Sequence, residues 1–177
     1  MLLYKHVDIV TWPMIQVRFQ HLMPDVKGQK SHTLKGEELA WVGSMLCNQV
    51  KKITGLDHTI KSAIVFAQEP NNIQELHVDG FSVDRKGASN WALNIPITEV
   101  GEMSWFGGKF HLSETANGEG LKYLQLNWHE EPYVIKSVMV DRPTVVRVDI
   151  PHQVVNQSSE QRRLILSARF TPDILGR

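Results

Sequence analysis

Beyond Gly55 the sequence consists of short β-prone runs separated by Gly, Pro, Asn and Asp, and this pattern restricts the possible folds more than any other feature. Many short strands with frequent turn signals are typical of sandwiches and barrels. The pattern predicts a jelly roll of the cupin type, in which two curled sheets limit the exposed edges. The expected strands are at about 58–68, 73–79, 90–98, 102–106, 109–113, 121–126, 132–140, 144–150, 152–156 and 162–170.

The N-terminal part has a different character, and we expect it to add helix to a mainly β protein. Residues 4–12 read as a strand, and the polar stretch 24–35 reads as a loop. Apolar residues recur at three- and four-residue steps over 35–54, which predicts an amphipathic helix with Gly55 as its C-terminal cap. This helix should cover one outer face of the jelly roll.

Length and composition predict one domain over residues 1–177, with an N-terminal strand and helix in 1–57 and the jelly-roll core in 58–170. The 19 basic residues balance the 19 acidic residues without a run of like charge, which argues against a nucleic-acid or anionic-membrane partner. No apolar run approaches the roughly 20 residues that span a bilayer. Because Cys47 is the single cysteine, the chain has no internal disulfide, and we expect a cytoplasmic protein.

The residues that point to chemistry are His77, Asp79 and the later His152. Two histidines and one carboxylate form the ligand set that holds Fe(II) in non-haem oxygenases and leaves open positions for oxygen and a co-substrate. Side chains two residues apart on a strand point to the same face, so His77 and Asp79 can share a metal. Gly80 lets the chain turn away from the metal, and Pro151 restricts the backbone before His152.

The His-x-acid motif is weak evidence by itself, because eight histidines among 177 residues produce about one match by chance. The chain has three matches. We assign His6-Val7-Asp8 to surface groups of an N-terminal strand and His129-Glu130-Glu131 to a loop before Pro132. Context therefore favours His77-Val78-Asp79, although a hydrogen-bonded pair without metal and a catalytic zinc site are alternatives.

Three arginines follow His152 and could clamp the carboxylate of a co-substrate: Arg162, Arg163 and Arg169. Strand alternation places Arg163 and Arg169 on one face, together with Ile165 and Ser167, and Arg162 on the other. Arg169 could be a second clamp or a buried structural partner. Asn94, if it points inward, could donate or accept a hydrogen bond with the co-substrate or a substrate. The polar segment 113–120 could act as a mobile lid.

These residues resemble the Fe(II)- and 2-oxoglutarate-dependent oxygenases over roughly residues 58–170. The pattern is His77-x-Asp79, then His152, then an arginine eleven residues later. The segment from Pro151 to Asn156, followed by Arg163 to Phe170, is similar to the last two core strands of the phytanoyl-CoA-hydroxylase-like and aspartyl/asparaginyl-hydroxylase-like branches. The run from Trp91 to Ile97 is similar to a strand of small bacterial and phage members.

The resemblance implies a double-stranded β-helix in which His77, Asp79 and His152 hold iron and 2-oxoglutarate chelates the metal. Its spacing favours Arg163 as the clamp for 2-oxoglutarate. The implied reaction consumes dioxygen, releases succinate and CO2, and hydroxylates a C–H bond of a small molecule or an amino-acid side chain. Two other classes stay open, a cupin-type metal enzyme that does not use 2-oxoglutarate and a non-catalytic binding module. Neither the substrate nor the oligomeric state follows from the sequence.

Overall fold

The computed structural model of the protein describes residues 1–80, 82–98, 101–116 and 122–176. Its helices are α1 (Trp12–Phe19) and α2 (Gly36–Thr54). Its strands are β1 (Tyr4–His6), β2 (Gln29–Thr33), β3 (Thr59–Gln68), β4 (Trp91–Pro96), β5 (Glu102–Gly107), β6 (Phe110–Ala116), β7 (Lys122–Trp128), β8 (Tyr133–Met139), β9 (Thr144–Arg147), β10 (His152–Val155) and β11 (Arg163–Thr171).

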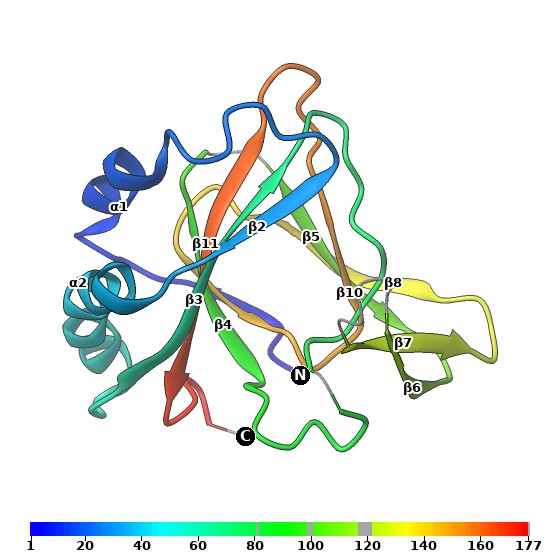
Figure 1. Ribbon diagram of the computed structural model, residues 1–177. Coiled ribbons are helices and arrows are strands. Elements are labelled where there is room, and N and C mark those ends of the chain that lie inside the picture. The colour runs from blue at the N-terminus through cyan, green and yellow to red at the C-terminus, as the bar shows by residue number, and fades with distance from the viewer. Residues whose placement is uncertain (81, 99–100, 117–121, 177) are drawn as a thin grey trace.

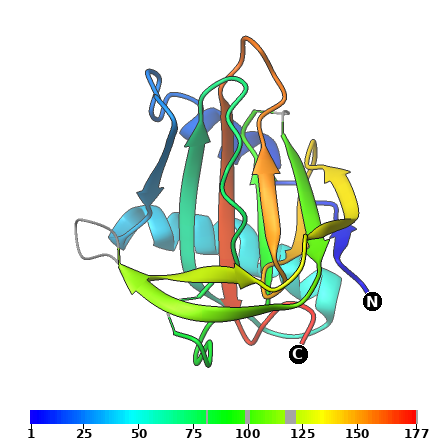
Figure 2. The same ribbon diagram turned by 90° about the vertical axis from the view of Figure 1, so that its right-hand side faces the viewer.

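The strands form two facing sheets and a hairpin, as the turn-rich pattern predicted (Figures 1 and 2). The larger sheet has the order β1-β9-β4-β11-β3-β2, and the smaller sheet has the order β10-β5-β8. All pairings of the named strands in the described parts of the chain are antiparallel. The strands β6 and β7 form a separate two-stranded hairpin. The prediction of a mainly β jelly roll with N-terminal helix is confirmed.

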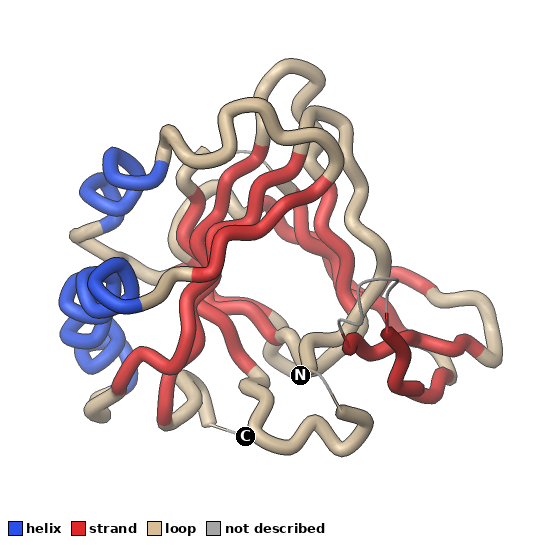
Figure 3. Tube along the Cα trace, in the orientation of Figure 1, coloured by secondary structure: helices blue, strands red, loops and turns tan. Residues whose placement is uncertain are grey.

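Both helices lie on the same side of the larger sheet, where α2 packs on β3 (Figure 3). The apolar face of α2 is buried at Val42, Leu46 and Val50, as its periodicity predicted. The helix approaches the sheet closely at Gly43, where a Cβ atom would lie 2.9 Å from Ile60 Cγ2. At Gly55 the left-handed conformation (φ 76°) ends the helix.

Alternation along β11 supplies residues to both faces of the larger sheet. Leu164, Leu166 and Phe170 join the apolar core beneath the helices. Arg163, Ile165, Ser167 and Arg169 point to the other side, where they line a cavity between the two sheets. The central strand β11 thus stabilises the outer core through one face and carries polar side chains through the other.

The structure differs from the sequence expectations in four places. Residues 24–35 contain the edge strand β2, so this stretch is not entirely a loop. The helix α1 was not predicted, and the expected strand 4–12 is only β1. Residues 73–79 form isolated bridges at Ile73 and His77 in place of a strand. Residues 113–116 of the expected lid belong to β6, and residues 117–120 lie outside the described part of the chain.

The N-terminal strands are part of the larger sheet. β1 pairs with β9 at one edge of the larger sheet, and β2 pairs with β3 at the other. The assignment of the whole chain to one oxygenase domain stays a prediction. Within the described ranges, neither helix is long and apolar enough to cross a membrane.

Candidate metal centre and its cavity

His77 and His152 face each other across an isolated antiparallel bridge. The His77 backbone N–H donates to the His152 carbonyl at 3.0 Å, and the reverse hydrogen bond is 2.9 Å long. The two ring centroids are 4.3 Å apart. His152 belongs to β10, which is anchored by its pairing with β5, so the bridge fixes the loop residue His77 against a regular strand. Local pairing therefore replaces the continuous strand that the sequence predicted at His77.

Both imidazoles are held in the tautomer that suits metal binding. His77 Nδ1 lies 2.9 Å from the Glu75 carbonyl oxygen, and His152 Nδ1 lies 2.8 Å from the Ile150 carbonyl oxygen. A carbonyl oxygen only accepts hydrogen bonds, so each neutral ring must carry its proton on Nδ1 and a free electron pair on Nε2. Both Nε2 atoms are thus ready to bind a cation.

Asp79 completes the triad. Its Oδ1 atom lies 3.6 Å from His77 Nε2 and 3.8 Å from His152 Nε2. Among the described residues these three are the set of His, Cys, Asp and Glu side chains whose donor atoms lie close enough to share an ion, all within 4.8 Å. Ligands bound at about 2.1 Å in neighbouring positions are roughly 3 Å apart, so small side-chain rotations bring the three atoms onto one ion. The donor set therefore fits a divalent metal.

The charges around the triad favour the ligand forms of Asp79 and His152. Burial raises the pKa of Asp79, but the positive charge of Arg169 and the two nearby imidazoles outweigh it and lower that pKa to about 2. Burial, assisted by the neighbouring His77, lowers the pKa of His152 to about 3. Asp79 is therefore ionised and His152 neutral at ordinary pH, and these are the forms that bind metal.

Arg163 shares the cavity with the triad and is almost completely buried, with 3% of its surface exposed. Its Nη1 donates to Gln68 Oε1 at 3.1 Å, whereas its buried Nε has no hydrogen-bond partner within the described ranges. None of the ion pairs among described residues includes Arg163. Burial lowers its pKa to about 10, so the guanidinium keeps its charge at neutral pH. Because an unpaired buried charge is costly, an anionic ligand bound beside Arg163 would be favourable.

Arg169 and Asn94 belong to a hydrogen-bonded chain behind the metal centre. Arg169 Nη2 pairs with Asp79 Oδ2, which leaves Oδ1 facing the histidines. Arg169 Nη1 donates to Ser167 Oγ at 2.7 Å, and Ser167 Oγ donates to Asn94 Oδ1. These contacts favour the structural alternative for Arg169. Arg162 points to the helix side, as alternation predicted, and donates to the Gln20 carbonyl oxygen after α1.

Several residues that line the cavity or contact its lining were missed by the sequence analysis because they carry no motif. Gln74 Nε2 lies 3.4 Å from His77 Nε2, and Gln68 supports Arg163 from behind. Gln68 is placed by the pairing of β3 with β11, and Gln74 is placed by the hydrogen bond from its backbone N–H to the Val154 carbonyl oxygen; the sequence reveals neither contact. The other lining residues that the sequence analysis did not single out are Gln29, Phe66, Met103, Val148 and Val154, whereas Ile165 and Ser167 lie on the face that alternation predicted.

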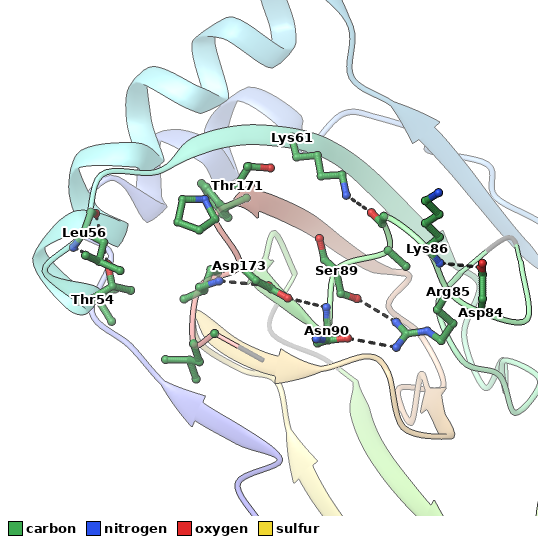
Figure 4. Close-up of a pocket in the computed structure, with 18 of the residues that line it drawn as sticks. Thr54, Leu56, Lys61, Asp84, Arg85, Lys86, Ser89, Asn90, Thr171 and Asp173 are labelled. Atoms are coloured by element: carbon green, nitrogen blue, oxygen red, sulfur yellow. Dashed lines mark hydrogen bonds between the residues drawn. The ribbon is translucent and has the colours of Figure 1, made fainter.

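Arg85 holds the backbone of Asp79 from the loop that follows it. Its Nε donates to the Asp79 carbonyl oxygen at 2.7 Å. The other guanidinium nitrogens donate to Asn90 Oδ1 and the Ser89 carbonyl oxygen, and the Asn90 N–H donates to Asp173 (Figure 4). The four residues of this network also line a larger surface hollow. No residue of the triad lines that hollow. The candidate metal centre therefore belongs to the smaller cavity between the sheets.

The two other His-x-acid motifs lie away from this centre, as expected. His6 Nδ1 is 2.9 Å from Thr144 Oγ1 at the edge of the larger sheet. His129 Nε2 is 3.0 Å from His111 Nδ1 on the exposed hairpin. Neither motif belongs to a three-residue metal cluster within the described ranges.

Comparison with solved structures identifies the fold. The carbocyclase SnoK from nogalamycin biosynthesis, described as non-haem and α-ketoglutarate dependent, aligns with a TM-score of 0.55 at 12% identity over 94% of this chain and 78% of that chain. The epimerase SnoN, in complex with Fe3+, α-ketoglutarate and nogalamycin RO, aligns with a TM-score of 0.52 at 14% identity over 93% and 77%. The chain has the jelly-roll fold of these enzymes.

A viral structure extends the comparison. The collagen prolyl hydroxylase of Paramecium Bursaria Chlorella virus-1, in its 2-oxoglutarate complex, aligns with a TM-score of 0.51 at 8% identity over 94% of each chain. No protein-family model matches the sequence, and a search of curated proteins finds no match. The likeness is therefore one of architecture.

Proposed function

We propose that this protein is an Fe(II)- and 2-oxoglutarate-dependent oxygenase that hydroxylates a C–H bond. One observation carries the proposal: a histidine–aspartate–histidine triad and a buried arginine without a carboxylate partner among the described residues line the same cavity. The triad matches the ligand preferences of divalent iron. The arginine matches the need of a dicarboxylate co-substrate, because a guanidinium binds carboxylate through paired hydrogen bonds.

His77, Asp79 and His152 would hold the iron and leave three coordination positions open. When bound, iron and 2-oxoglutarate supply the oxidative chemistry, in which dioxygen is consumed, succinate and CO2 are released and a substrate C–H bond is oxidised. Arg163 would bind the carboxylate of 2-oxoglutarate that lies away from the metal. Asn94, at the end of the Arg169–Ser167 chain, is proposed to hydrogen-bond the co-substrate or substrate.

The remaining cavity residues would exclude water and orient the substrate. Phe66, Met103, Val154 and Ile165 give the cavity an apolar lining, which strengthens the polar contacts made within it. Arg169 would keep Asp79 ionised and turned toward the metal. Arg169 would thus act as residues around other metal sites do, where groups that hydrogen-bond a ligand set its orientation.

The finer assignments rest on the sequence pattern. We infer a small-molecule or amino-acid side-chain substrate, cytoplasmic location and no nucleic-acid or membrane partner from the neutral charge and single cysteine. The phytanoyl-CoA-hydroxylase-like or aspartyl/asparaginyl-hydroxylase-like branch is proposed from the segments around His152 and Arg163. Hydroxylation is proposed over other outcomes, although the similar structures include an epimerase and a carbocyclase.

Isothermal titration of 2-oxoglutarate into anaerobic Fe(II)-loaded protein tests the proposal. We expect saturable one-to-one binding that requires metal. Arg163→Met should weaken it by on the order of 100-fold, because the variant keeps most of the side-chain volume but loses the charge. Metal binding should be unchanged in this variant. Metal binding without 2-oxoglutarate binding in the wild-type protein would support a cupin-type enzyme instead, and absence of both would support a binding module.

A further inference from the structure

The side chain of Gln68 is the direct polar contact of the buried Arg163. Gln68 ends β3 and lies opposite Arg163 in the antiparallel pairing of β3 with β11. Directly opposed residues project to the same face of a sheet, so their side chains meet. Gln68 is 1% exposed, and its Oε1 accepts the hydrogen bond from Arg163 Nη1. The contact therefore lies inside the protein and not at the mouth of the cavity.

The orientation of the Gln68 amide is determined by its other neighbours. Its Nε2 donates to Asn72 Oδ1 at 3.2 Å and approaches the Val154 carbonyl oxygen at 3.5 Å. A guanidinium only donates and a carbonyl only accepts, so the amide oxygen must face Arg163 and the NH2 group must face Val154. The negative end of a neutral dipole thus points at the guanidinium.

Arg163 is confined on another side by backbone. A Cβ atom on Gly101 would lie 2.4 Å from both Cδ and Nε of Arg163, and Gly101 adopts a φ of +125° that favours glycine. Glycine and glutamine thus place the guanidinium without adding a negative charge. A glutamate at position 68 would have the same shape and would neutralise Arg163 permanently.

We propose that Gln68 is a positioning residue that orients Arg163 while leaving its positive charge available for the distal carboxylate of the 2-oxo acid. This inference rests on the proposed function and names a determinant of co-substrate selection within it. The neutral amide makes the bound dicarboxylate the counter-ion of Arg163. The cavity should therefore distinguish 2-oxo acids by whether they carry a second carboxylate.

The test compares two co-substrate probes on four proteins. The probes are 2-oxoglutarate and 2-oxobutyrate, which keeps the 2-oxo acid group but lacks the distal carboxylate. The proteins are the wild type, Gln68→Glu, Gln68→Leu and the control Gln125→Glu, which makes the same charge change as Gln68→Glu on an exposed residue of β7. Affinities are measured by isothermal titration into Mn(II)-loaded protein without oxygen, and melting temperatures of the metal-free proteins confirm folding.

We expect Gln68→Glu to weaken 2-oxoglutarate binding by on the order of 100-fold, because the new carboxylate occupies Arg163. Binding of 2-oxobutyrate should stay within about two-fold of wild type, and Gln125→Glu should bind both probes normally. Gln68→Leu, which removes the acceptor without adding charge, should weaken 2-oxoglutarate binding by about ten-fold. It serves as the deciding variant if Gln68→Glu does not fold.

The outcomes separate this inference from the proposed function. If wild-type protein binds metal but not 2-oxoglutarate, the proposed function fails and the inference fails with it. If the wild type binds 2-oxoglutarate and the Gln68 variants bind it equally well, only the inference is overturned. Equal losses for both probes would also overturn it, because they would indicate general damage to the cavity.

Discussion

At the scale of residues, the groups around the triad set the tautomers of its histidines and the orientation of its carboxylate. A backbone carbonyl two residues earlier selects the tautomer of each histidine, and Arg169 directs Asp79 Oδ1 toward the two imidazoles. The backbone carbonyls only accept hydrogen bonds and the Arg169 guanidinium only donates them, and neither role changes with pH near neutrality. If a cation binds as proposed, the three donor atoms would therefore need little reorganisation.

The neutral state of His152 has a consequence for stability in acid. Its pKa is about 3 in the folded protein against 6.5 for an unperturbed histidine, so the unfolded chain takes up a proton that the native state excludes. The stability that this residue contributes is complete above pH 6.5 and is lost as the pH falls toward 3. The slope approaches roughly 1.4 kcal/mol per pH unit for one proton.

Urea unfolding between pH 7.5 and 4.5, with chelator present, measures this effect. We expect the free energy of unfolding of the wild type to fall more steeply with acid than that of His152→Gln. The other seven histidines are common to both proteins, so the difference between the two slopes isolates His152. Parallel curves for the two proteins would contradict the buried neutral assignment.

At the scale of elements, two of the three triad residues lie on a connection instead of a strand. His77 and Asp79 belong to the segment between β3 and β4, where backbone bonds to His152 and Val148 fix their positions. Arg85 adds a third attachment through the Asp79 carbonyl oxygen. His77 and Asp79 are therefore positioned by hydrogen bonds to residues that are distant in sequence, in place of a strand of their own.

Removal of the Arg85 attachment should loosen the carboxylate ligand. We expect Arg85→Met to lower Mn(II) affinity by about ten-fold, which is typical of losing an outer-shell contact, with a small change in melting temperature. Lys86→Met is the matched control, because it removes a positive charge from the next residue without touching Asp79. Titration calorimetry with Mn(II) provides the measurement, and equal affinities in the two variants would show that Arg85 does not support the site.

At the scale of the whole molecule, the cavity is a joint product of both sheets. The larger sheet contributes Arg163, Asn94 and Arg169, and the smaller sheet contributes His152 and Met103. Metal and co-substrate should thus connect elements from both layers. Ligands that bind only the native state raise stability by mass action, by about 2.7 kcal/mol at 100 times the dissociation constant.

Thermal unfolding with added ligands tests this coupling. We expect Mn(II) to raise the melting temperature of the wild-type protein, and 2-oxoglutarate to raise it further only when Mn(II) is present. Asp79→Ala should abolish both increases, because it removes a metal ligand. A 2-oxoglutarate effect of equal size without metal would show that the co-substrate does not depend on the triad.

Much of this architecture was predictable from local patterns. Turn residues between short β-prone runs predicted the jelly roll, and the apolar spacing before Gly55 predicted α2 and its end. Alternation predicted that Arg163 and Arg169 share a face and that Arg162 lies on the other. These features depend on the period of a helix or strand, which is a property of neighbouring residues.

The sequence alone named the candidate ligands, because two histidines, a carboxylate and a following arginine stand at a spacing that resembles one family of oxygenases. Only the tertiary structure decided that His77 is held by a bridge, that Arg169 serves Asp79, and that Gln68 is the neutral partner of Arg163. These depend on strand register and on contacts between residues about 75 to 95 positions apart. The neighbouring sequence does not predict such contacts, because a polar residue at a strand end has no feature that identifies its partner before the strand register is known.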